Sequence, residues 1–465
     1  MSQRQASAFE FIFFPSVAML LGWGLRGYIG GGPFGAMIPG SFVALSLSMM
    51  LGHKKEAAAM AALFGAIGIG FGGDMTYGQT LGFLRDAETV SWGLLGCTVK
   101  GAVWGLLGCA VLAVGLTRNQ YKYTTLLAAF AVSIVAFYIG IKLINEPKLI
   151  YFSNRLDRPR DESWAGLLFA AIAFLSFLRW RAKGEHAGLP LRFAGWGALG
   201  GALGFGGGAL WMVIGPKLPL PQQWFGWWKA MEFSFGAILG AAIGLAGYRN
   251  RDQISDSGKN NAKSELGLGS FLGLVAIVLA GFFVLPFLAR AAGDSPVAGL
   301  VRFVLMFLRT FTVFGFICLA LGLRSPHTAW QVAITLTFFH TVLDMNEDMF
   351  DHGGITWEPA TLATVLIVFT AGMALLVGLC HRHARAVPIL FLSLVAACYG
   401  VSCVKTFLYR DYFIHGLGYM LTKDPAIVLV HLIFTVSTIV TSAYIYVFWE
   451  RSVTRGIGSH KVENT

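Results

Sequence analysis

Long apolar runs, separated by short polar or charged segments, follow one another along almost the whole chain. Each run approaches the roughly 20 residues that an α-helix needs to cross the hydrocarbon core of a bilayer, so the pattern predicts about 14 spanning helices. Their expected ranges are 9–27, 34–52, 57–73, 91–116, 125–144, 163–178, 190–215, 224–247, 267–289, 297–323, 328–343, 358–380, 387–409 and 426–449. The run at 328–343 is short, and we expect it to continue as a polar extension.

The composition leads to the same fold class. Of the 465 residues, 56% are hydrophobic and only 13% are charged, and the mean hydropathy is +0.65. Soluble domains carry about twice this charged share, and disordered chains are poor in apolar residues. The six cysteines form no C-x-x-C pair and are typical of small buried hydrophobic residues, so we expect no disulfide, no metal thiolate site and no cofactor. The chain is therefore predicted to be an all-α polytopic integral membrane protein.

The charged residues of the loops predict an orientation. Loops on the cytoplasmic side carry an excess of Lys and Arg. With the N-terminus in the cytoplasm, most basic loop residues fall inside and most acidic ones, Glu162 among them, fall outside. The loop 145–162 is the exception, because it carries both signs. An even number of spans then places both termini in the cytoplasm, at a bacterial-type inner or plasma membrane. The net charge of +11 belongs to these loops and does not indicate nucleic-acid binding.

A polar linker at 248–266 divides the chain into an N-terminal bundle, 1–247, of eight spans and a C-terminal bundle, 267–465, of six. The N-terminal bundle is rich in glycine. The string GFGG occurs at 70–73 and 204–207, each copy is expected to end a span, and a Trp-containing span follows each one. These features suggest two parallel four-helix copies. The alternative is a chance likeness between glycine-rich helices that pack closely.

The first apolar run ends in a cluster of glycines and a proline. It lacks an A-x-A-like cleavage site and is interpreted as a first spanning helix, not as a removable signal. Gly30, Gly31, Gly32 and Pro33 interrupt the chain shortly after Arg26. A broken or re-entrant segment at 27–33 would direct backbone groups into a cavity, whereas the Lys-Ser/Thr tail of a nucleotide-binding loop is absent.

Several charged residues are expected deep in the membrane, where each charge costs about 2.5–3.5 kcal/mol unless it is paired or hydrated. The set comprises Lys100, Lys229, Glu232, Arg302, Arg309 and Lys405, with Arg26 near a helix end. Lys229 and Glu232 are three residues apart and can pair on one helix face, which is the simplest role for both. Lys100 has no such neighbour and needs a partner from another helix or an anionic ligand. The excess of cations favours an anion, and we assign Arg26, Lys100, Lys229, Glu232, Arg302 and Arg309 to substrate binding.

A stripe of ionisable residues follows the eleventh predicted span. On a helix, His340, Asp344, Glu347 or Asp348, and Asp351 lie on one face. Grouped carboxylates beside a histidine suit a proton relay or a hard-cation site, although the spacings of an EF-hand or an H-E-x-x-H site are absent. We assign this stripe, with Asp74 at the end of the third span, to ion or proton coupling. The alternatives are a solvated acidic helix end and, for Asp74, a helix-end carboxylate in contact with water.

These features predict a multi-pass transporter for an anionic or polar small molecule, coupled to protons or a cation. The alternative is a membrane-embedded transferase or flippase that acts on a lipid-linked phosphate. In both cases the partners are membrane lipids and an anionic small-molecule or lipid-phosphate substrate. The pattern specifies neither a catalytic residue nor an oligomeric state.

Overall fold

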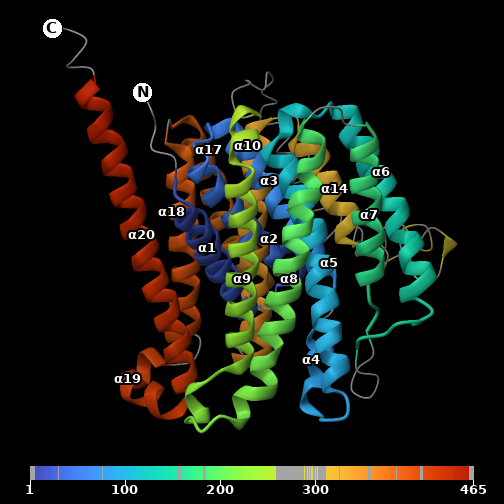
Figure 1. Ribbon diagram of the computed structural model, residues 1–465. Coiled ribbons are helices and arrows are strands. Elements are labelled where there is room, and N and C mark those ends of the chain that lie inside the picture. Colours follow the sequence, from blue (N-terminus) through green and yellow to red (C-terminus); the bar gives the residue numbers. More distant parts are fainter. Residues whose placement is uncertain are drawn as a thin grey trace.

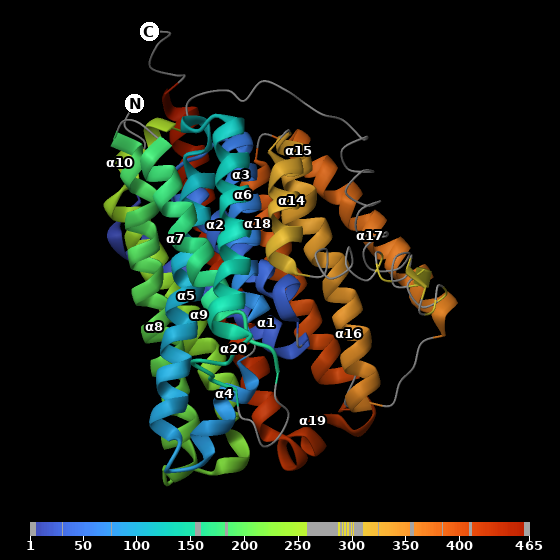
Figure 2. The same cartoon turned by 90° about the vertical axis from the view of Figure 1, so that its right-hand side faces the viewer.

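A computed structural model describes the chain at residues 6–29, 31–75, 77–153, 160–181, 185–257, 310–323, 325–353, 358–383, 385–408 and 412–459, with a few isolated positions between 287 and 301. Within these ranges the ordered elements are helices and no strand is present. The longer helices run side by side along a common axis (Figures 1 and 2).

Most described helices keep to the boundaries that the apolar runs predict, within a few residues, whereas α20 continues to Ser459, beyond its predicted end at 449. In the N-terminal half they are α1 (Ala8–Ile29), α2 (Gly32–Met50), α3 (Lys55–Phe71), α4 (Gly78–Gly82), α5 (Val90–Leu116), α6 (Tyr123–Gly140), α7 (Trp164–Arg181), α8 (Leu189–Ile214), α9 (Trp227–Arg249) and α10 (Arg251–Ser257). In the C-terminal half they are α14 (Phe311–Gly322), α15 (Pro326–Trp330), α16 (Thr337–Gly353), α17 (Pro359–Arg382), α18 (Ala386–Cys403), α19 (Tyr412–Lys423) and α20 (Pro425–Ser459).

Eleven helices of the described part are long and apolar enough to cross a membrane: α1 to α3, α5 to α9, α17, α18 and α20. Three predicted spans are not among them. The run 267–289 lies almost wholly outside the described residues, and the described part of 297–323 is α14, an apolar helix of 12 residues. The run 328–343 becomes part of a longer helical stretch that ends, as expected, in the polar helix α16. The chain is an integral membrane protein by these criteria, and the count of 14 stays a prediction.

The two ends of the helical bundle differ. α1 begins and α20 ends at the same end, the upper one in Figure 1, as an even number of crossings requires. α4, α19 and the segment between α8 and α9 lie at the opposite end. The side of the membrane that each end faces remains the prediction made from loop charge.

Glycines set the close packing of the N-terminal helices. α5 and α8 approach through Gly101 and Gly105 on one side and Gly197 and Gly201 on the other, where an added Cβ would overlap the carbonyl oxygen of the facing glycine. This is the small-residue packing typical of membrane helices. The absence of a side chain at these positions therefore determines which helices meet.

The second GFGG string does not end a span. The first copy, at 70–73, does end α3, but the copy at 204–207 lies inside α8, which continues to Ile214. The expectation that both copies end a helix is therefore wrong, because the run of small residues around 204–207 packs within a longer helix. The structure confirms no internal repeat.

The linker and the C-terminal half are only partly described. α10 forms the first part of the predicted linker 248–266, and residues 258–266 lie outside the described ranges. The C-terminal helices pack on the N-terminal ones: the Ser41 hydroxyl donates to the Ala333 carbonyl over 2.7 Å, and the Phe42 and Phe391 rings lie edge to face. The division at the linker stays a prediction.

Candidate functional site

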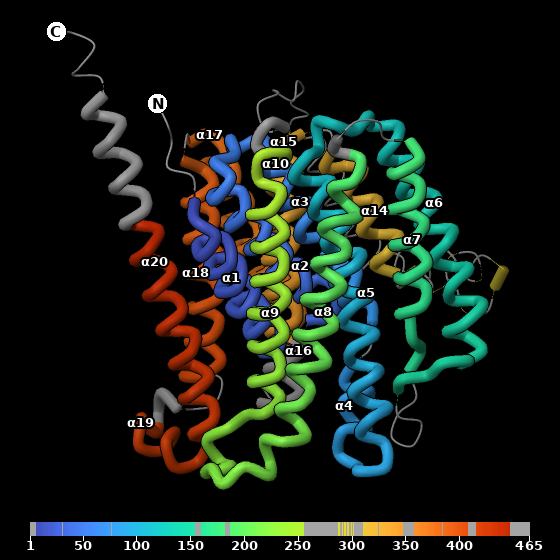
Figure 3. The backbone as a smooth tube through the Cα atoms, in the orientation of Figure 1, coloured from blue at the N-terminus to red at the C-terminus, as the bar shows by residue number. Residues whose placement is uncertain are grey.

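Ionisable side chains gather where the chain passes from α1 to α2. α1 ends at Ile29 and α2 begins at Gly32, whose φ of +24° suits a residue without a Cβ. Pro33 lies in the first turn of α2, where its missing N–H leaves no hydrogen bond unmade. This junction, drawn dark blue, lies within the height of the bundle and not at its lower surface (Figure 3). The predicted break in the helical chain is confirmed at this position.

Arg26, in the last turn of α1, is the central cation of this junction. Its side chain is buried, and its Nη1 donates to the Tyr77 hydroxyl over 2.8 Å. Nε donates to the Gly32 carbonyl over 3.3 Å. The guanidinium carbon lies 5.1 to 5.5 Å from the ring centres of Tyr77, Trp104 and Trp23, distances typical of cation–π contacts. Among the described residues no carboxylate lies within ion-pair distance of Arg26.

Glu232, on the second turn of α9, is the carboxylate nearest to this group of rings. It is 1% exposed, and its Oε1 accepts a hydrogen bond from the Trp228 indole over 2.8 Å. The Tyr77 hydroxyl donates to the same oxygen over a long 3.5 Å. Oε2 accepts from Lys229 over 2.7 Å, which confirms the predicted pair. Tyr77 therefore bridges Arg26 and Glu232.

Two ammonium groups flank Tyr28, near the end of α1. The Lys229 Nζ lies 4.7 Å and the Lys405 Nζ 5.4 Å from the centre of the Tyr28 ring. Lys405 also donates to the Tyr28 carbonyl. It belongs to a π-helical segment, Val404–Leu408, and such segments are frequent at functional sites.

Part of the predicted acidic stripe lies across the junction from Arg26. On α16 the His340 Nδ1 and the Asp344 Oδ2 are 3.0 Å apart, so the two side chains share a face as predicted. The His340 ring stacks on Phe34 of α2, with ring centres 4.1 Å apart. A Cβ on Gly31 would lie 3.0 Å from the Asp344 carboxylate, which places this pair against the chain break. The side chains of Glu347, Asp348 and Asp351, on the same helix, lie outside the described part.

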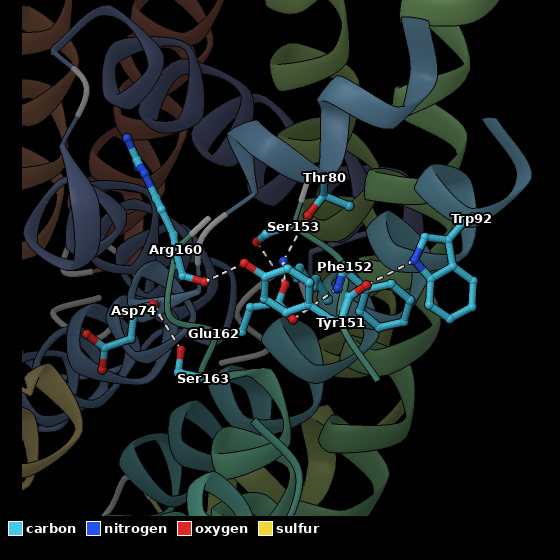
Figure 4. A network of polar contacts seen from close by, with 10 residues as sticks. Asp74, Thr80, Trp92, Tyr151, Phe152, Ser153, Arg160, Glu162 and Ser163 are labelled. Carbon is cyan, nitrogen blue, oxygen red and sulfur yellow. Dashed lines mark hydrogen bonds and ion pairs between the residues drawn. The ribbon is translucent and has the colours of Figure 1, made fainter. Parts of the chain in front are cut away.

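Lys100 belongs to a polar network whose partners Thr80, Phe152, Ser153 and Glu162 are labelled in Figure 4. Its Nζ donates to Glu162 Oε1 over 2.6 Å and to the Thr80 hydroxyl over 2.8 Å. The second carboxylate oxygen accepts the Phe152 N–H over 3.0 Å, and the Ser153 hydroxyl donates to the first over 3.1 Å. Of the two predicted alternatives for Lys100, the structure supplies the protein partner.

Glu162 corrects an expectation. The charge pattern indicates a solvated acid of an outer loop, but the residue is only 4% exposed. The expectation fails because Glu162, at the end of a loop, turns inward and forms an ion pair with the buried Lys100. The mixed signs of the loop 145–162 were the only sequence signal for this contact.

Asp74 holds the start of another helix. Its Oδ2 accepts the backbone N–H and the hydroxyl of Thr312, over 3.0 and 3.1 Å, in the first turn of α14. Its carbonyl accepts the Ser163 hydroxyl over 2.9 Å (Figure 4). An acceptor for the free N–H groups of a first helical turn is a cap. These contacts give Asp74 a structural role, and the preceding residue, Gly73, packs against Gly32 and Pro33 of the junction.

The remaining predicted residues, Arg302 and Arg309, lie outside the described part of the chain. The aromatic neighbours of Arg26 were not predicted, because tryptophan and tyrosine in apolar runs give no sign of the cation they will meet. No group of three or more potential metal-ligating side chains occurs in the described ranges.

The structure therefore brings Arg26, Lys229, Glu232, His340 and Asp344 of the predicted residues to one junction, whereas Lys100 pairs with Glu162 and Asp74 caps α14. Searches of protein-family models, of curated proteins and of solved structures found no match for this chain.

Proposed function

We propose that this protein is a membrane transporter for a small anionic molecule and that the anion binds at the α1–α2 junction, with Arg26 as its principal partner. The observation that carries the proposal is the environment of Arg26. Its guanidinium is buried, enclosed by aromatic rings and hydrogen-bonded only to neutral oxygens of the described residues.

The buried positive charge of Arg26 favours an anionic ligand. A buried cation without a counter-ion is costly, and chains normally supply a carboxylate, as this one does for Lys100. An anionic ligand would give the guanidinium the charged partner that it lacks among the described residues. The planar fork of a guanidinium matches carboxylate and phosphate groups in particular, and Nη2 of Arg26 makes no hydrogen bond within the described part.

The chain break supports a ligand site on separate grounds. Non-helical backbone at membrane depth is tolerated where it lines a cavity or is buried in protein, and transporters bind substrates at such broken helices. The proton coupling expected from the sequence belongs to the same proposal. Glu232 and the His340–Asp344 pair are the titratable groups that border the break on its two sides.

The first test is a thermal-shift screen of the purified protein in detergent. One arm contains acetate, lactate, succinate and inorganic phosphate, and the other contains a polyprenyl phosphate. A ligand at 100 times its Kd raises the free energy of unfolding by about 2.7 kcal/mol. We expect stabilisation by a soluble anion in the wild type and in the control Arg181→Gln, an exposed arginine, but not in Arg26→Gln.

Uptake of the stabilising anion into proteoliposomes then tests transport itself. Equal uptake by Arg26→Gln and wild type would contradict the site. Stabilisation by the polyprenyl phosphate alone would favour the alternative, a flippase or transferase for a lipid-linked substrate. Formation of a covalent product would identify the transferase.

A further inference from the structure

We infer that Glu232 is an internal substitute for the ligand: a small carboxylate ligand replaces the Glu232 carboxylate among its donors, and Glu232 then takes up one proton. This inference rests on the proposed function and adds the ligand class and the residue that carries the proton.

The donors around Glu232 form a site for a carboxylate of any origin. They are the Trp228 indole, the Lys229 ammonium and the Tyr77 hydroxyl, and they come from two segments of the chain. Two neutral N–H or O–H donors and one cation are a common set for a bound carboxylate. The hydrogen bond from Tyr77 is the longest of the three, at 3.5 Å. The Tyr77 hydroxyl is therefore the donor that can most easily exchange Glu232 for another acceptor.

Tyr77 connects this site to Arg26. The hydroxyl accepts from Arg26 Nη1 over 2.8 Å and has one hydrogen, which points toward Glu232. A ligand carboxylate that binds Arg26 meets the same hydroxyl and therefore competes directly with Glu232. Glu232 is ion-paired with Lys229 and not with Arg26, so a ligand carboxylate at Arg26 provides a charged partner that Glu232 does not.

A glycine provides the room in which the carboxylate of Glu232 lies. A Cβ on Gly27 would overlap the carboxyl group of Glu232, so α1 is recessed at this point. The recess lies in the last turn of α1, between Arg26 and Tyr28 in the sequence. A carboxylate can occupy the recess only because position 27 has no side chain.

The titratable and charged groups that face Glu232 come from four segments. They are Arg26 and Tyr28 of α1, Tyr77 before α4, Lys229 of α9, and Lys405 beyond the Tyr28 ring. His340 and Asp344 lie at Gly31, farther along the break. Three of the facing groups, Arg26, Lys229 and Lys405, carry a positive charge. Glu232 loses the contact with Lys229 when a ligand carboxylate takes its place, and its protonation then removes the repulsion between the two carboxylates.

The exchange is balanced without any covalent step. One ligand carboxylate enters, one proton from water binds the Glu232 carboxylate, and the net charge of the site does not change. Binding that takes up one proton strengthens by up to about tenfold for each unit that the pH falls.

The test measures binding of acetate, lactate and succinate to the purified protein by thermal shift at pH 7.5, 6.5 and 5.5. In the wild type we expect the apparent affinity for the best probe to rise about tenfold per pH unit. Glu232→Gln keeps the size of the side chain but cannot exchange a proton, so its affinity should be nearly independent of pH. His340→Gln should retain the slope.

Two results would overturn the inference. One is a wild-type slope in Glu232→Gln, and a slope that is also lost in His340→Gln would then assign the proton to His340. The other is stabilisation of the wild type by inorganic phosphate but by no carboxylate. Loss of binding in Arg26→Gln together with an unchanged slope in Glu232→Gln would leave the proposed function standing and refute only the proton carrier. Unchanged binding in Arg26→Gln would refute the function itself.

Gly27→Ala provides a second variant that does not depend on the titration. The added methyl group fills the recess, so we expect the loss of carboxylate binding at every pH. Gly207→Ala is the matched control, because a Cβ at that helical glycine meets no atom. Wild-type binding by Gly27→Ala would contradict the recess as the ligand site.

Discussion

Lys100 and Arg26 are both cations buried in the same bundle, and the structure treats them in opposite ways. Lys100 meets a carboxylate at 2.6 Å, and its partner Glu162 is in turn saturated by backbone and hydroxyl donors. Arg26 meets three aromatic rings, a hydroxyl and a carbonyl. A buried charge with a complete set of partners holds the fold together. A buried charge with an incomplete set retains the capacity to bind a ligand.

Loss of Glu162 should have the largest effect on stability. Removing one partner of a buried ion pair costs about 3–5 kcal/mol, because the other charge remains buried. Glu162→Ala should therefore lower the thermal unfolding midpoint sharply, with or without ligand. The control is Lys142→Ala, whose pair with Glu146 is exposed and is expected to contribute about 0–1 kcal/mol. Equal unfolding midpoints for the two variants would contradict the role of the Lys100–Glu162 pair in stability.

Loss of Arg26 should have the opposite signature. Arg26→Gln removes a cation that has no carboxylate partner in the described part, so the unliganded protein should keep its unfolding midpoint. The ligand-dependent stabilisation, about 2.7 kcal/mol at 100 times Kd, should disappear. A large loss of unliganded stability, comparable to that of Glu162→Ala, would show that Arg26 is a second structural charge.

Asp74 offers an intermediate case, since it was predicted to couple ions and is found capping α14. Loss of a helix cap costs about 0.5–2 kcal/mol. Asp74→Ala should lower the free energy of unfolding by about 1 kcal/mol and leave the pH dependence of ligand binding intact, with the exposed Glu88→Ala as the control. The capping role of Asp74 would be contradicted if Asp74→Ala altered the pH dependence of ligand binding and left the free energy of unfolding unchanged.

The smallest effect is expected for the hydroxyl between Arg26 and Glu232. Tyr77→Phe keeps the ring beside Arg26 but removes a hydrogen bond worth about 0.5–1.5 kcal/mol. Affinity for the carboxylate probe should therefore fall about two- to tenfold. Tyr399→Phe is the comparison variant, because it removes a hydroxyl from a tyrosine whose ring stacks on His431 of α20 and not on Arg26. An unchanged affinity would show that the Tyr77 hydroxyl does not link Arg26 to Glu232, which would contradict the exchange of carboxylates through Tyr77.

The local sequence pattern was sufficient to predict most of the helices and one ion pair, Lys229–Glu232. A run of apolar residues determines a membrane helix because unpaired backbone groups are too costly in lipid. Lys229 and Glu232 are three residues apart on one helix, so helical geometry alone brings them together. The break between α1 and α2 was likewise predicted, since consecutive glycines followed by a proline lower the helix propensity of the chain there.

The contacts between distant segments were not available from pattern. Glu162 is 62 residues from Lys100, and Thr312 is 238 residues from Asp74. No periodicity relates such positions, so loop charge suggested solvated carboxylates where the fold has buried ones. The second GFGG string shows the same limit, because its letters match the first copy while its place in the helix does not.

The sequence by itself determined that the chain is a bundle of membrane helices and where most of the described helices begin and end, within a few residues. These are local properties, set by hydropathy and by the conformational limits of single residues. Only the tertiary structure decided which of the deep charges are satisfied. A counter-ion is supplied by whichever segment packs alongside, and the packing of glycine faces, aromatic rings and loops placed Glu162 beside Lys100 and aromatic rings beside Arg26.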